Sequence, residues 1–435
     1  MDLFVPPKPA VPPEPLPLRQ FFRSIRNNAL ATWPAAAYEQ PFLRRNMLGR
    51  ANLLLNAPDA IRQVLVDNPA NYRRSPAAIR ILRPIAGQGL LLAEGDIWKL
   101  QRRTVAPALA PRMMPLLTRH IVATTREAMD ALQDRIGAPV DLLSAMQNLT
   151  LEIAGRSMFS LEMQQFGAEM RRMLTEYGEN HARPGMLDLV LPTAIPTPGD
   201  FGRRRFQKRW MALIEAIMRD RLRAPPPDQP RDLFDLLRAA RDPETGVGFS
   251  PDQLRDQVAT LILAGHETTA VSLFWSLNLL AQAPDEQQKL ALDLENRTKA
   301  VFSEALRLFP PAYVIVREAL GPDLAGEQKI GRGDVVMIAP WVLHRHHGLW
   351  RDPDAFDPSR FLPGVPPPPR FSYLPFGVGP RICVGAQFAL TEAAIVLAAV
   401  IERFDVSLES DRLVLPVGIV TTQPDHAPAF RLRLR

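Results

Sequence analysis

The order of apolar and polar positions along this 435-residue chain predicts a largely helical protein. The longest helical pattern begins at residues 250–253, Ser-Pro-Asp-Gln, a capping box with proline at the first helical position. No further proline occurs before Pro284, so we expect one helix of about 30 residues and about 45 Å. A second run, residues 386–404, has apolar side chains on almost every face and predicts a buried helix.

Shorter patterns surround these two helices. Residues 42–57 favour a small sheet with a turn, and residues 59–66 a short helix with Asp59 as its N-cap. Residues 75–95 carry several prolines and glycines but are rich in Ile and Leu, so we expect an apolar loop beside a ligand pocket. Further expected elements are helices within 117–180 and over 203–223, a connector over 181–202, a Pro-rich linker over 224–230, a turn over 418–422, and strands over 312–317 and 430–435.

Composition adds a proline-rich start to this picture. Residues 6–17 contain so many of the 44 prolines that neither a helix nor a central strand is possible there. No run of about 18 uncharged apolar residues is present, so we expect neither a signal peptide nor a transmembrane anchor. No repeat or independent module is evident. The expected organisation is a Pro-rich extended segment over 1–41 and a single domain over 42–435.

Charge and cysteine content exclude several function classes. The net charge of +6 comes from scattered basic residues without a Lys/Arg block, so a solvated surface is expected and no nucleic-acid partner. Cys383 is the only cysteine, which excludes an intramolecular disulfide and an iron–sulfur cluster. A single free thiol suits a reducing compartment, and we expect a cytoplasmic protein.

The lone cysteine lies in residues 376–385, Phe-Gly-Val-Gly-Pro-Arg-Ile-Cys-Val-Gly. Gly377 and Gly379 allow a tight bend that can direct backbone N–H groups at the sulfur and stabilise a thiolate. The helix expected after Gly385 places the sulfur near a positive helix end. This environment favours a metal-ligating thiolate; the alternative is a buried cysteine that packs as a small hydrophobe.

A second unusual segment is Ala-Gly-His-Glu-Thr-Thr, residues 264–269, in the middle of the long helix. Gly and two Thr cost roughly a kcal/mol or more of helix propensity, which some other role should compensate. Threonine hydroxyls can bond back to the carbonyl four residues earlier and open the helix for a ligand or water. The alternative is a kinked core helix with satisfied hydroxyls, and His266 is expected to be a packed or pocket-lining residue.

Together these segments resemble two motifs of the cytochrome P450 family, F-G-x-G-x-R-x-C-x-G and (A/G)-G-x-(D/E)-T-T. Weaker matches are Trp98 with Arg102, and Glu304 with Arg307, whose third family partner is matched by Arg360 although Ser359 departs from the usual Glu. The resemblance spans roughly residues 53–434. It implies the cytochrome P450 fold, mainly α with a small β-rich subregion.

The resemblance also implies a site. Cys383 would be the axial metal ligand of haem b, and Glu267 with Thr268 would be the catalytic pair that delivers protons. Arginines at the haem edge would bind its propionates, as would the Trp98–Arg102 pair. The implied cofactor-binding residues are Trp98, Arg102, Ala264, Arg317, Phe376, Gly377, Arg381, Cys383 and Gly385.

The implied activity is that of a haem-thiolate monooxygenase, which inserts one atom of O2 into an apolar small molecule such as a fatty acid, terpenoid or aromatic. No intrinsic flavin or iron–sulfur motif is found, so electrons would come from a separate donor, expected to be a ferredoxin with its reductase. We expect a monomer, with Lys99 and Arg103 on the donor-docking face and Arg112 nearby. A haem-binding sensor or carrier and an electron-independent, peroxide-using relative remain as alternatives.

Residues 344–347, His-Arg-His-His, also suggest a metal site. The family has a similar His-Arg segment at this place, so a structural role is the main expectation.

Overall fold

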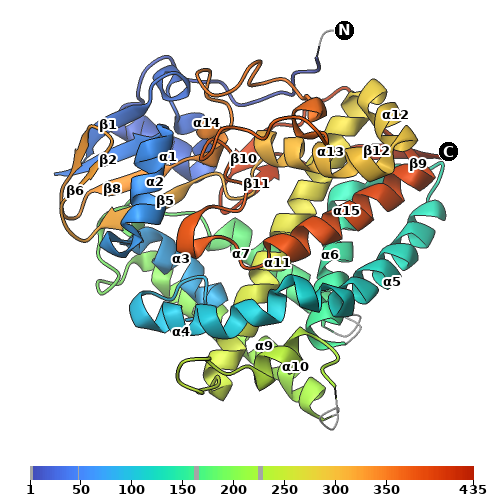
Figure 1. Ribbon diagram of the computed structural model, residues 1–435, viewed down its shortest axis with the longest axis horizontal. Coiled ribbons are helices and arrows are strands. Elements are labelled where there is room, and N and C mark those ends of the chain that lie inside the picture. The colour runs from blue at the N-terminus through green and yellow to red at the C-terminus, as the bar shows by residue number, and fades with distance from the viewer. Residues whose placement is uncertain (1–2, 48, 161–165, 224–228) are drawn as a thin grey trace.

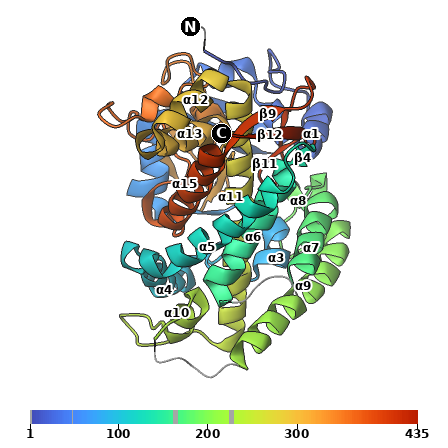
Figure 2. The same ribbon diagram turned by 90° about the vertical axis from the view of Figure 1, so that its right-hand side faces the viewer.

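The computed structural model describes residues 3–47, 49–160, 166–223 and 229–435, and its helices outweigh its strands (Figure 1). The central element is α11 (Pro251–Gln282), which passes through the middle of the molecule in both views (Figures 1 and 2). Its start has the expected capping box: the Ser250 hydroxyl accepts from the Gln253 amide, and the Gln253 side chain accepts from the Ser250 amide. In length and composition, α11 alone among the described helices could cross a membrane, but it is mostly buried, as a core helix would be.

The helices that enclose α11 include α6 (Leu142–Phe159), α13 (Leu294–Leu308) and α15 (Ala386–Arg403). The other helices of 11 or more residues are α3 (Pro76–Ala86), α4 (Gly95–Val105), α5 (Met114–Gln133), α7 (Gly167–Asn180) and α9 (Pro198–Leu222). The shorter ones are α1 (Leu18–Asn27), α2 (Pro58–Arg62), α8 (Met186–Val190), α10 (Leu233–Ala239), α12 (Pro284–Leu292) and α14 (Pro340–Leu343).

The largest sheet joins residues 42–74 to residues 315–338 and lies at the left of Figure 1. Its order is β1-β2-β8-β5-β3, and only the β2–β8 pair is parallel. These strands are β1 (Phe42–Met47), β2 (Arg50–Leu55), β3 (Tyr72–Arg74), β5 (Ile315–Ala319) and β8 (Val335–Ile338). The smaller sheets are β4 (Val140–Asp141) with β12 (Ala429–Leu434) and β9 (Phe404–Leu408), β6 (Asp323–Ala325) with β7 (Gln328–Ile330), and β10 (Pro416–Gly418) with β11 (Thr422–Pro424).

The apolar core changes partners along α11. Its first half, including Leu254 and Leu263, packs in one cluster with residues of α9 and of the segment that follows α3. Its second half, from Ala270 to Leu280, packs in another cluster with α13, α15 and β12. Residues 264–269 lie where the two clusters meet, so the polar segment of the helix occupies a gap between two blocks of apolar packing.

Most expected elements are confirmed, and several details are wrong. Residues 75–95 are not all loop: Ser75 caps α3 by accepting from the Ala78 amide, and the helix continues through Pro84. Asp59 is not the N-cap of α2, which starts one residue earlier at Pro58 with Ala57 as cap. The connector expected over 181–202 contains α8 and the start of α9.

The N-terminal segment is also less extended than expected. Residues 3–17 form no helix or strand, but α1 follows within the segment assigned to 1–41, and its capping is weak because Pro17 offers no side-chain acceptor. Most of the expected Pro-rich linker, residues 224–228, lies outside the described residues.

We define residues 376–385 as the Cys383 loop. The fully buried ion pair of Glu304 and Arg307, both in α13, is bonded to the segment that precedes this loop. Arg307 Nε and Nη2 each donate to the Glu304 carboxylate at 2.7 Å. Arg307 also donates to the carbonyls of His344, Pro353 and Ala355. Arg360 approaches the Glu304 carboxylate at 3.5 Å, so the trio suggested by the sequence does form.

Glu304→Gln should lower the free energy of unfolding by about 3–5 kcal/mol, because Arg307 would keep a buried charge without its carboxylate partner. Denaturant-induced unfolding measures this change. Glu169→Gln, in the exposed pair with Arg172 on α7, is the control and should have little effect. Equal effects of the two substitutions would contradict a structural role of the buried pair.

Candidate active site

The Cys383 loop is held in a tight bend. Gly377 and Gly379 both adopt positive φ angles, +69° and +77°. Gly379 is constrained further, because a Cβ there would lie 2.0 Å from the carbonyl oxygen of Leu65. The loop closes through a hydrogen bond of 2.9 Å from the Cys383 amide to the Phe376 carbonyl. The bend expected from the glycines is therefore present.

Cys383 is an exposed residue, although protein atoms surround its thiol. Burial raises the pKa of the Cys383 thiol, while the Gly385 amide and the positive charge of Arg102 favour the thiolate. The amide that faces the sulfur is that of Gly385, at the start of α15. A bound metal ion would deprotonate such a thiol outright.

On α11, Ala264 and Thr268 form an open turn. The Thr268 hydroxyl donates to the Ala264 carbonyl at 2.6 Å, which is the back-bonding expected from the sequence. Ala264 is exposed although it belongs to a mostly buried helix, and a Cβ built on Gly265 would meet no atom within 4 Å. This face of the helix therefore has room for a flat ligand. Val384 of the Cys383 loop packs against the apolar cluster to which Leu263 belongs, so the loop lies beside the first half of α11.

His266 points away from this space. Its Nε2 lies 2.9 Å from the carbonyl oxygen of Gln147 on α6, and burial lowers the pKa of the imidazole to about 4. It is a packed histidine, as expected.

Glu267 is bound by residues that the sequence did not identify. Its Oε1 accepts from Gln423 Nε2 at 2.6 Å and from Thr421 Oγ1 at 3.2 Å. Burial raises the pKa of the Glu267 carboxyl, and these two donors oppose the rise. The described contacts include no hydrogen bond between Glu267 and Thr268, so the acid and the alcohol are neighbours on the helix with different partners.

Three arginines gather on the sheet side of the Cys383 loop. Arg74 of β3 and Arg317 of β5 are paired in register, and Arg381 lies in the loop itself. We call these residues the arginine triad. Glu94 is the carboxylate that acts on all three, and it accepts a hydrogen bond from Arg381. The triad therefore has three cations against one anion.

The triad is held under electrostatic strain. Burial, together with the charges of Arg317 and Arg381, lowers the pKa of Arg74 to about 9; burial and Arg381 lower the pKa of Arg317 to about 10. The buried Nε of Arg74 has no hydrogen-bond partner in the described structure. Two further carboxylates would balance these charges. The sequence does not distinguish the role of Arg74 from that of its neighbour Arg73, so only the strand pairing shows that Arg74 belongs to the triad.

Trp98 and Arg102 of α4 both contact the Cys383 loop. The guanidinium of Arg381 lies over the Trp98 ring, 4.5 Å from its centroid. Arg102 donates to the Ile382 carbonyl at 2.8 Å, and no charge interaction connects it to the triad. Arg102 thus lies nearer the sulfur, whereas Arg317 and Arg381 are grouped with Arg74.

One further sequence expectation, the donor-docking face, and one alternative, the metal site at residues 344–347, lose support. Lys99 is paired with Asp96, and Arg103 is paired with Asp242 and Glu244, so the cations expected to attract an electron donor are already compensated. His344 accepts from the Leu374 amide and contacts the Arg307 carbonyl, and the described residues contain no cluster of three metal-ligating side chains.

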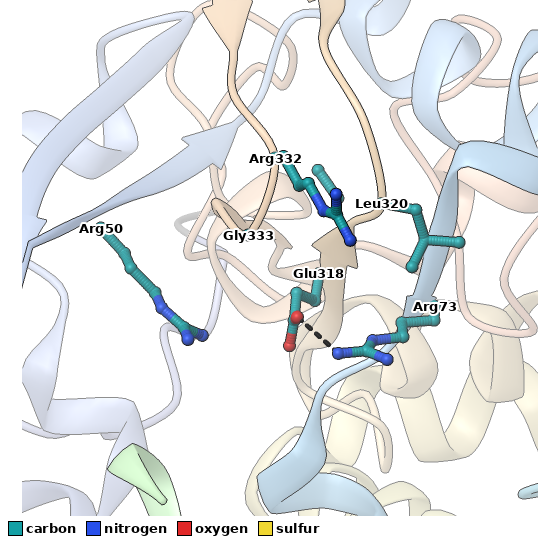
Figure 3. Close-up of a pocket in the computed structure, with 7 residues that line it drawn as sticks. Arg50, Arg73, Glu318, Leu320, Arg332 and Gly333 are labelled. Carbon is teal, nitrogen blue, oxygen red and sulfur yellow. Dashed lines mark hydrogen bonds and ion pairs between the residues drawn. The ribbon is translucent and has the colours of Figure 1, made fainter. Parts of the chain in front are cut away.

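A separate pocket of about 340 Å³ lies at the edge of the large sheet (Figure 3). Arg50, Arg73 and Arg332 surround Glu318 there, and Arg73 is paired with Glu318 at 2.7 Å. Its lining includes no residue of α11 or of the Cys383 loop, so it is not part of the candidate active site.

Comparison with known proteins shows the family: the cytochrome P450 model matches residues 9–425, and the chain belongs to this family. It is 33% identical over 367 residues to "Cyclooctatin synthase" of Streptomyces melanosporofaciens, covering 80% of this chain and 79% of that protein. It is 28% identical over 365 residues to "Cyclooctat-9-en-7-ol 5-monooxygenase" of the same organism, covering 80% and 78%. The protein is a cytochrome P450 monooxygenase, and the class expected from the sequence is confirmed.

The fold agrees with this assignment. The crystal structure of the cytochrome P450DA heme domain superposes with a TM-score of 0.80 at 23% identity, covering 99% of this chain and 98% of that one.

The residues present fit the haem that the family implies. Cys383 would be the axial ligand, the open turn at Ala264 and Gly265 leaves room for the porphyrin, and the unbalanced arginine triad would receive two propionates.

Arg74→Gln and Arg317→Leu should each lower haem occupancy, because a buried propionate would lose its cation at a cost of about 2–5 kcal/mol. The measurement is the haem-to-protein ratio of the purified protein. Arg73→Gln is the matched control: it changes the adjacent residue of β3, which pairs with Glu318 instead. Full occupancy in both triad variants would refute this role.

Proposed function

We propose that this cytochrome P450 inserts one atom of O2 into an apolar small molecule, such as a fatty acid, terpenoid or aromatic, with electrons from a separate protein. The observation that carries the proposal is the acid–alcohol pair Glu267–Thr268 on the face of α11 that borders the Cys383 loop. A haem carrier without turnover has no need of this pair.

The surroundings of the site support an apolar substrate. Ile419 and Val420, at the tip of the β10–β11 hairpin, pack with Val384 and Phe388 against the cluster of Leu263. Apolar walls hold an apolar molecule and exclude water, while the few polar groups orient the reaction.

Each polar residue then has one task. Haem with a thiolate ligand, when bound, supplies the activation of O2. Cys383 provides that thiolate, and the Gly385 amide moderates its basicity. The Thr268 hydroxyl holds a proton beside the reacting centre. Glu267 replaces that proton, and its raised pKa keeps a proton available closer to neutral pH than an exposed glutamate would.

The electron donor is part of the proposal. The chain has no flavin motif and its single cysteine cannot hold an iron–sulfur cluster, so we infer a ferredoxin with its reductase. A cytoplasmic location is proposed on the same ground of one free thiol.

The test is turnover of candidate apolar substrates with a surrogate ferredoxin, its reductase and NADH under ¹⁸O2. Substrates are first selected by the change in haem spin state on binding. One labelled oxygen per product supports the proposal. Substrate binding without product supports a carrier, and product formation with peroxide alone indicates a peroxide-using relative.

Cys383→Ser should abolish the red-shifted Soret band of the reduced carbon monoxide complex, because no other thiol can replace the ligand. The absorption spectrum of the reconstituted variant measures this. Persistence of the band would rule out Cys383 as the ligand.

Thr268→Ala should uncouple turnover: NADH use continues while product per NADH falls several-fold and hydrogen peroxide rises, because a proton donor is lost. Thr298→Ala is the matched control, since Thr298 makes the same back-bond at 2.6 Å on α13. Unchanged coupling in Thr268→Ala would transfer the role to another group, of which the adjacent Thr269 is the first candidate.

A further inference from the structure

Glu267 is attached to a part of the chain far from it in sequence. Gln423 and Thr421, which bind its Oε1, belong to β11 and to the turn before it, more than 150 residues downstream. Gln423 Nε2 also donates to Thr421 Oγ1 at 2.9 Å, so the three side chains form a closed triangle of hydrogen bonds. Both donors are directed at the same carboxylate oxygen.

The strand that carries these donors is fixed by the residue between them. Thr422, between them, is fully buried; its hydroxyl donates to the Pro310 carbonyl at 2.6 Å, and its own carbonyl accepts from Trp275 of α11 at 2.8 Å. Its amide donates to the Pro311 carbonyl. Because side chains alternate along a strand, fixing Thr422 sets the direction of Thr421 and Gln423. The donors are therefore preorganised toward α11.

No charged group acts on Glu267 within the described parts of the chain. From β11 and the turn before it, Glu267 meets an amide and a hydroxyl, both uncharged, and neither α6, α13 nor α15 contributes a cation or an anion to its surroundings. The neighbouring titratable residue of α11, His266, is turned to Gln147 on α6. The only specific influences on the Glu267 carboxyl, apart from burial, are thus the two donors of the hairpin.

We propose that Gln423, assisted by Thr421, is a positioning residue that holds Glu267 away from Thr268 and sets the pH at which it takes up a proton. The proposal rests on the proposed function, in which Glu267 replaces the proton of Thr268. A carboxylate can only accept hydrogen bonds, so both donors stabilise its ionised form. Protonation weakens the hydrogen bonds from Gln423 and Thr421, so the protonated form of Glu267 is the one that is released toward Thr268.

The first experiment measures Glu267 directly. In the ferric, haem-loaded protein, the carbonyl stretch of protonated Glu267 is titrated by infrared difference spectroscopy and assigned by its loss in Glu267→Gln. Gln423→Met, of similar size without a donor, should move this titration to higher pH, because ionised Glu267 loses its nearest donor. Gln423→Lys, with a charged donor, should move it to lower pH. Thr421→Val should act in the same direction as Gln423→Met but less, since its hydrogen bond is longer.

A matched control separates positioning from folding. Thr422→Val removes only the side-chain bond to Pro310; the backbone bonds of Thr422 to Pro311 and Trp275, which fix the strand, and both donors to Glu267 stay in place. It should leave the titration close to that of the parent. If Thr422→Val shifts it as far as Gln423→Met, or if Gln423→Met and Gln423→Lys shift it in the same direction or not at all, the proposal is wrong.

The second experiment connects the titration to turnover. The pH profile of product formed per NADH should follow the infrared midpoint, upward in Gln423→Met and downward in Gln423→Lys. Opposite infrared shifts in Gln423→Met and Gln423→Lys, with no product from any substrate, would support the positioning role and contradict the proposed function. Normal product formation with unshifted titrations would support the proposed function and contradict the positioning role.

Discussion

The structure depends on the burial of one helix whose middle is not apolar. Helix α11 is packed by one apolar cluster along its first half and by another along its second, and residues 264–269 lie at the junction. Apolar packing on both sides fixes the helix along its length, so the polar turn between cannot move without disturbing two cores. A glycine and two threonines that would weaken an isolated helix are tolerated because tertiary packing stabilises the flanking turns.

Buried charges are compensated to different degrees on the two sides of the Cys383 loop. On the α13 side, Glu304 and Arg307 compensate each other and every strong donor of the arginine has an acceptor. On the sheet side, the arginine triad remains under-compensated: the pKa values of Arg74 and Arg317 are lowered, and the buried Nε of Arg74 makes no hydrogen bond and lies 3.9 Å from Glu94. The first arrangement stabilises the fold by itself. The second stores unfavourable energy that an anionic cofactor would release, which makes cofactor binding and folding stability interdependent.

The sequence predicts local features of the site well, because these depend on short-range chemistry. The positive φ angles at Gly377 and Gly379, the capping box at Ser250 and the back-bond of Thr268 are all settled within a few residues. Helix α3 is not predicted because the prolines and glycines of residues 75–95 resemble loop signals, although Ser75 before Pro76 is a good cap.

Features that depend on tertiary pairing could not be predicted. Arg74 acquires its place only through the β3–β5 register, and Gln423 only through docking of the hairpin on α11. The compensation of Arg103 by Asp242 likewise joins residues 139 positions apart, which no local pattern reveals.

The single cysteine has a practical consequence for any preparation of this protein. With one sulfhydryl per chain, each molecule has its sulfur either ligated or free, and no second thiol adds a background. A maleimide dye applied to the native protein therefore counts the molecules that lack cofactor, and the same dye in denaturant counts all of them. The ratio of the two numbers gives the loaded fraction by covalent chemistry, without reference to absorbance.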